Sequence, residues 1–172
     1  VRSDTVFWQL TDSGPFLKRY PKFTLAGLLL CQHKLAVFRG TLPAEKQAEL
    51  QQVQTEVDQS LSSWRSNVER KALREIGGRL HSWEWYLSDC REDPGDCAAH
   101  YATEVCARVY IHFLLRLLSE LHEADGARAQ VGAADAELRT VFRPGAFVWE
   151  ANLGAAFPNE EYWFLYGRPG SP

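Results

Sequence analysis

The sequence contains no methionine, only four cysteines in 172 residues, and no apolar run long enough to cross a bilayer. Its longest apolar stretches, TLAGLLLC at 24–31 and FLLRLL at 113–118, are far shorter than the roughly 20 residues of a membrane-spanning helix. So few cysteines do not make a disulfide scaffold, and we expect a soluble protein in the reducing cytoplasm. The missing starting methionine leaves open whether a leader was removed.

The sequence has no large excess of charge of either sign, because the formal net charge is only −3. No overall field draws the chain to nucleic acid or to an anionic membrane, so we expect neither as a partner. The local balance is uneven. Residues 64–79 carry five cations against two anions, whereas residues 84–104 carry six anions against one arginine.

Several motifs of enzymes are missing as well. The sequence has no Gly-x-Gly-x-x-Gly, Gly-x-Ser-x-Gly, Walker or His-Glu-x-x-His pattern. It also lacks the Glu-x-x-His repeats with which helical bundles bind two metal ions. We therefore expect no cofactor.

The apolar positions predict a single all-α domain over 1–172, a bundle of four main helices within 24–143. The first helix follows the cap residue Thr24 and ends near Gly40, although its LLL and LAVF runs leave a strand as the alternative. The second is strongest over 44–75, where apolar residues recur every three or four positions, and a kink or break is expected at Gly77 and Gly78.

Proline and glycine mark the remaining boundaries. The REDPGD turn at 91–96 ends the second helix, and Asp96 is a candidate cap for a third helix that ends near Asp125. A fourth helix over 132–142 stops at Pro144. Residues 1–23 predict an irregular arm, and the aromatic tail at 144–172 is expected to pack on the bundle or on a partner.

The stretch 81–112 gathers three of the four cysteines and three of the five histidines. Cys97 and His100 have the spacing of a metal-ligand pair, but Cys106 lies about 13 Å further along a helix at 1.5 Å per residue, so a zinc site is disfavoured. Buried or isolated thiols are the first reading. A disulfide between Cys90 and Cys97 across the turn is the second.

Histidine and aromatic residues of the same stretch supply the candidate binding site. His81 with Glu84, and His100 with Glu104, share helix faces and could act as acid and base. Without a nucleophile or phosphate loop, we favour a non-enzymatic module that binds a protein or a small ligand and could form a homodimer. A metal-dependent or acid/base enzyme is the alternative. The candidate ligand-binding residues are His81, Trp83, Glu84, Trp85, His100, Tyr101 and Glu104.

Overall fold

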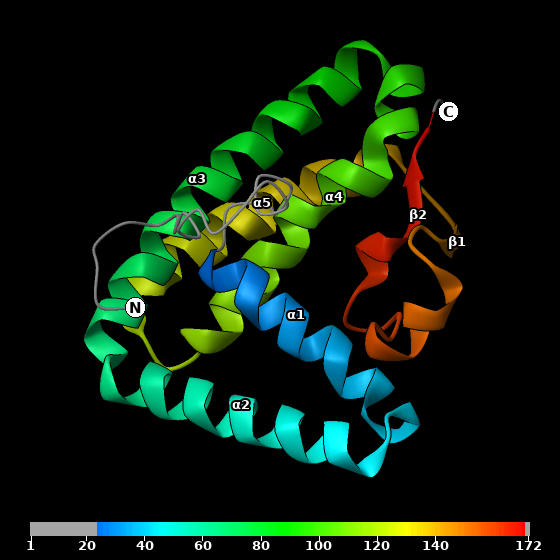
Figure 1. The fold of residues 1–172 in the computed structure, drawn as a ribbon. Helices are drawn as coiled ribbons and strands as arrows, with labels where there is room; N and C mark the ends of the chain where they lie inside the picture. Colours follow the sequence, from blue (N-terminus) through cyan, green and yellow to red (C-terminus); the bar gives the residue numbers. More distant parts are fainter. Residues whose placement is uncertain (1–23, 171–172) are drawn as a thin grey trace, which may run out of the picture.

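The computed structural model describes residues 24–170 and confirms the all-α prediction, with a small two-stranded sheet added by the tail (Figure 1). The predicted arm at 1–23 lies outside the described residues. The α-helices are α1 (Leu25–Phe38), α2 (Ala44–Ser63), α3 (Arg65–Glu92), α4 (Pro94–Leu117) and α5 (Asp125–Val141). The strands are β1 (Phe142–Phe147) and β2 (Tyr166–Pro169), and short 3₁₀ segments lie at Arg39–Thr41, His122–Ala124, Ala151–Ala156 and Trp163–Leu165.

The first predicted helix is present as α1, which settles the alternative of a strand. The Thr24 hydroxyl oxygen accepts a hydrogen bond from the Gly27 N–H at 3.0 Å and caps the helix as its sequence predicts. An anion supports the same end, because the buried Glu75 carboxylate of α3 accepts from the Ala26 N–H at 3.3 Å. A carboxylate there complements the positive end of the helix dipole and ties α1 to α3.

The prediction of one uninterrupted helix over 44–75 is wrong, because the chain breaks at Trp64. That residue has φ −115° and ψ 28°, outside helical geometry, and it separates α2 from α3. The two helices have different surroundings. No residue of α2 is buried, whereas Val68, Ala72 and Ile76 of α3 lie in the core. Core packing therefore sets the direction of α3. Helix α2 has no such packing, and it ends at the break just before the buried part of α3 begins.

The break expected at Gly77 and Gly78 does not occur, because α3 runs through both glycines to Glu92. Both are exposed, while the flanking Ile76 and Leu80 are almost fully buried. Packing of these neighbours against the core outweighs the roughly 1 kcal/mol that each glycine costs in a helix.

The helical hairpin predicted around REDPGD is formed by α3 and α4, but its cap is one turn earlier than expected. Asp93, and not Asp96, is the N-cap, and its Oδ1 accepts from the N–H groups of Gly95 and Asp96 at 3.1 and 3.0 Å. Pro94 occupies the first helical position, where its missing N–H costs nothing. Helix α4 ends at Leu117 and α5 already begins at Asp125, both earlier than predicted.

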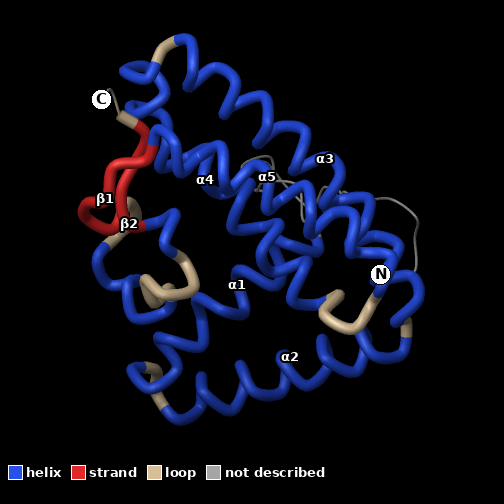
Figure 2. Tube along the Cα trace, turned by 180° about the vertical axis from the view of Figure 1, so that it is seen from behind, coloured by secondary structure: helices blue, strands red, loops and turns tan. Residues whose placement is uncertain are grey.

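The aromatic tail packs on the helices, as predicted. Strands β1 and β2 pair antiparallel, with Phe142 opposite Pro169. Side-chain hydrogen bonds fasten the tail to α4, two of them from aromatic residues: the Tyr101 hydroxyl donates to the Phe164 carbonyl at 2.6 Å, and the Trp149 Nε1–H donates to the Ala102 carbonyl at 2.8 Å. Residues of the tail thereby form part of the core beside α4, and the tail lies along one side of that helix (Figure 2).

In the part of the chain that the structure describes, no helix has both the length and the apolar character needed to cross a membrane.

Candidate functional site

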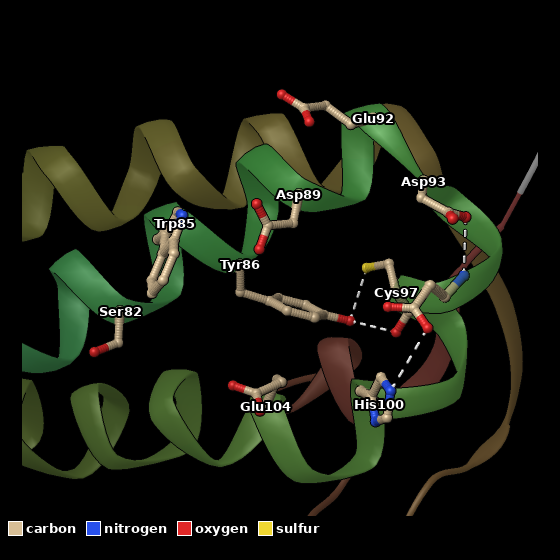
Figure 3. Close-up of a pocket in the computed structure, with 10 residues that line it drawn as sticks. Ser82, Trp85, Tyr86, Asp89, Glu92, Asp93, Cys97, His100 and Glu104 are labelled. Carbon is tan, nitrogen blue, oxygen red and sulfur yellow. Dashed lines mark hydrogen bonds and ion pairs between the residues drawn. The ribbon is translucent and has the colours of Figure 1, made fainter.

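A groove of about 540 Å³ lies between α3 and α4, next to the turn that joins them (Figure 3). Residues at spacings of three or four along each helix form its walls, because such positions share one helix face. The lining residues are Ser82, Trp85, Tyr86, Asp89, Glu92, Asp93, Asp96, Cys97, His100 and Glu104. We call this feature the α3–α4 groove.

A disulfide between Cys90 and Cys97 closes the turn end of the α3–α4 groove. The Cα atoms of the two cysteines are 5.0 Å apart, so the last turn of α3 is joined to the first turn of α4. The second reading of the sequence is therefore the one that the structure shows for these two cysteines. The other two, Cys31 and Cys106, are free thiols.

Tyr86 lies beside the disulfide and forms part of the inner wall of the groove. Its hydroxyl donates to the Cys97 carbonyl at 2.7 Å and lies 2.8 Å from the Cys97 Sγ. Burial raises the pKa of Tyr86 above its ordinary value, and the negative charges of Glu104 and Asp96 raise it further. The phenol therefore stays protonated and serves as a fixed hydrogen-bond donor that joins the two helices.

The α3–α4 groove is strongly acidic, with five carboxylates among its lining residues. Asp93 is used as the cap of α4, and Asp96 lies 3.7 Å from His100, between Oδ1 and Nε2. Asp89, Glu92 and Glu104 are exposed, and their side chains have neither a hydrogen bond nor an ion pair with any residue of 24–170. Negative charge is therefore concentrated here, and no lysine or arginine is among the described residues that line the groove.

An exposed aromatic ring stands beside these carboxylates. Trp85 is 69% exposed, the most exposed of the large apolar side chains in the described chain. In Figure 3 it projects from α3 on the same side as Asp89, facing the helix that carries His100 and Glu104. An open indole face next to unpaired carboxylates is suited to a cation, because the ring quadrupole and the charges attract it together.

The structure brings three of the seven predicted binding residues into the groove, namely Trp85, His100 and Glu104. Trp83 and Tyr101 are each 1% exposed and belong to the core, where their rings pack near each other and near Tyr86. His81 and Glu84 are exposed on α3 and do not line the groove. The two histidine–glutamate pairs therefore do not share one site.

Metal binding by the pair Cys97 and His100 is contradicted for the thiolate ligand, because the Cys97 sulfur is bonded to Cys90. Among residues 24–170 there is also no group of three or more His, Cys, Asp or Glu side chains that could hold a metal ion. The α3–α4 groove thus presents separated carboxylates, His100 and the exposed ring of Trp85 rather than a metal-ligand cluster.

The acidic run at 84–104 is visible in the sequence, but Asp89, Glu92 and Asp96 were not predicted as site residues. The spacing on α3 could have indicated a common face, since Ser82, Trp85, Asp89 and Glu92 follow one another every three or four residues. Whether that face was buried or open was not visible in the sequence.

No family model matches the chain, and no curated protein or solved structure matches it.

Proposed function

We propose that this protein is a non-enzymatic interaction module whose α3–α4 groove binds a cationic segment of a partner protein. One observation carries the proposal: three unpaired carboxylates line an open groove next to a tryptophan that is 69% exposed. Arginine or lysine side chains would satisfy both features at once.

Charge and shape support a peptide-like ligand. Asp89 and Glu92 come from α3 and Glu104 comes from α4, so the charges line both walls of the groove. An extended segment with several cations could contact both walls, whereas one small cation would contact only part of them. Arginine is the best match, because its planar guanidinium can stack on Trp85 and pair with a carboxylate in two-pronged geometry.

The alternative of an acid/base enzyme receives less support from this geometry. It needs the His81/Glu84 pair and the His100/Glu104 pair in one site, and only the second pair lines the groove. His100 has its nearest carboxylate partner in the exposed Asp96 rather than in Glu104. We therefore keep the binding function as the proposal.

The test is binding of a fluorescein-labelled peptide of arginine, glycine and serine, followed by fluorescence anisotropy at low salt. The variant Asp89→Asn/Glu92→Gln/Glu104→Gln removes the three unpaired charges and should raise the Kd at least about tenfold, since each exposed ion pair contributes up to about 1 kcal/mol. Raising the salt concentration should weaken wild-type binding in the same direction.

A matched control is Glu45→Gln/Asp58→Asn/Glu123→Gln, which neutralises three exposed carboxylates outside the groove. It changes the net charge by the same amount and should leave the Kd within about twofold of wild type. Trp85→Ala should raise the Kd about two- to fivefold through the lost cation–π contact. Equal weakening by the groove variant and the control would contradict a specific groove and indicate only nonspecific attraction.

A further inference from the structure

The outer face of the β1–β2 hairpin carries two arginines that face each other. Arg143 and Arg168 are direct partners in the register, and directly opposite residues of an antiparallel pair point to the same side of the sheet. Both arginines are exposed, and the neighbours of Arg168 in β2, Gly167 and Pro169, are buried. We call Arg143 and Arg168 together the arginine face.

Neither guanidinium group of this face has a hydrogen bond, an ion pair or an aromatic stacking partner among residues 24–170. Other arginines do: Arg108 pairs with Asp135 at 2.7 Å, Arg91 with Glu137 at 3.1 Å, and Arg139 stacks on Trp163 at 3.7 Å. Like charges directly opposite each other destabilise a strand pair. A bound anionic group would remove that repulsion.

The same chain holds the complementary surface, because the α3–α4 groove has three unpaired carboxylates. Within one copy, no ion pair among residues 24–170 joins the arginine face to these carboxylates. The tail is fastened to α4 through Tyr101 and Ala102, whereas the groove uses His100 and Glu104 on another face of that helix. In Figures 1 and 2 the hairpin lies at the edge of the molecule, where a second copy can approach it.

We propose that the protein associates with itself head to tail, the arginine face of one copy docking in the α3–α4 groove of the next. This inference rests on the proposed function and names the cationic segment as β1–β2 of a second copy. Two adjacent guanidinium groups match carboxylates on two walls, and Trp85 offers a stacking surface for one of them. A head-to-tail contact uses different surfaces on the two copies, so it can repeat and form chains or rings.

The first measurement is sedimentation velocity of the wild-type protein over a range of concentrations at low salt. The weight-average mass should rise above the 19.5 kDa of one copy as concentration rises, without stopping at two copies. At about 0.5 M salt it should fall back toward one copy, since exposed ion pairs are then screened within a few ångströms. A single copy at every concentration would overturn the inference.

Two neutralised variants test which surfaces meet. Asp89→Asn/Glu92→Gln/Glu104→Gln removes the groove charges, and Arg143→Gln/Arg168→Gln removes the arginine face; each variant alone should stay a single copy. A mixture keeps one intact arginine face and one intact groove, so it should form a one-to-one dimer and nothing larger. Arg39→Gln, an exposed arginine outside both surfaces, should associate like wild type.

The outcomes separate this inference from the proposed function. A wild-type protein that binds the arginine peptide in the groove but never associates overturns self-association and leaves the proposed function standing. Association that survives in either neutralised variant overturns the pairing of these two surfaces. Peptide competition with association, together with dimer formation only in the mixture, supports both.

Discussion

His112 lies at the junction of α4 and the tail, where a charged network meets buried rings. In the structure its side chain is 16% exposed and its Nε2 is 2.9 Å from the Glu161 Oε1. Arg116 approaches the same oxygen at 3.3 Å, and the ring of Tyr162 lies 4.7 Å away between centroids.

Burial, with the positive charge of Arg108 adding to it, lowers the pKa of His112 below its ordinary 6.5 despite the nearby Glu161. Because the folded pKa is the lower one, the unfolded chain takes up the proton first. Full stability is therefore present above about pH 6.5 and is lost as the pH falls from there through the folded pKa.

We expect the stability advantage of the wild type over His112→Gln to shrink as the pH falls from 7.5 to 5. The variant cannot take up this proton, so the comparison isolates one group from the other titrations. Urea denaturation at both pH values measures the two free energies of unfolding. An unchanged advantage would mean that the pKa of His112 is the same in the folded and unfolded chains, and a larger one at pH 5 would mean that Glu161 raises the folded pKa.

At the scale of elements, α3 shows how packing overrides local preference. Its two central glycines weaken the helix but are exposed, and a Cβ added at either Gly77 or Gly78 would meet no atom within 4 Å. We expect Gly77→Ala and Gly78→Ala each to raise the free energy of unfolding by about 0.5–1 kcal/mol, because alanine is the better helix former and restricts the unfolded chain. Thermal or urea denaturation measures the change.

The contrasting position is Gly167 in β2, which has a φ of +144° that other residues rarely adopt. A Cβ there would collide with the Arg143 carbonyl oxygen and the Phe142 ring. Gly167→Ala should therefore destabilise the protein by about 1–3 kcal/mol. If Gly77→Ala and Gly78→Ala also destabilised the protein, the prediction for α3 would be wrong, and side chains would not be tolerated at these helix positions.

For the whole molecule, the most consequential feature is that, unlike α3, helix α2 has no buried residue. It has 20 residues, none buried, and Val53 in its middle is 51% exposed. In Figure 1 it runs along the lower edge, joins the start of α3, and lies away from the turn between α3 and α4. Helices of this length are marginal without packing, so α2 depends on few contacts.

We expect amide hydrogen exchange to be faster in α2 than at the core positions of α3 and α4. Local opening needs less free energy where few apolar contacts are lost, whereas core amides exchange near the global limit. Exchange followed by mass spectrometry of peptides from 44–63 and 98–114 makes the comparison within one sample. Equal protection in both segments would indicate that something covers α2 in solution.

The redox state of Cys90 and Cys97 bears on the compartment in which the protein functions. The disulfide between Cys90 and Cys97 joins the two helices that form the groove, and such bonds persist mainly in oxidising compartments. The cytoplasmic location expected from the low cysteine content stays a prediction.

The sequence by itself determined the helical class, the cap at Thr24, the hairpin around Pro94 and the packed aromatic tail. These follow from short-range rules: apolar residues every three or four positions, cap residues, and proline or glycine at turns. The three-residue spacing of Asp89 and Glu92 also indicated that these two carboxylates share one helix face.

Only the tertiary structure decided the break at Trp64, the straight course of α3 through its glycines, and which aromatic rings stay open. Trp83 and Trp85 are two residues apart, yet one is 1% and the other 69% exposed. That difference depends on where α4 and the tail pack against α3, and such contacts join residues far apart in the chain. For the same reason the groove and the arginine face are visible only once the helices and the tail are in place.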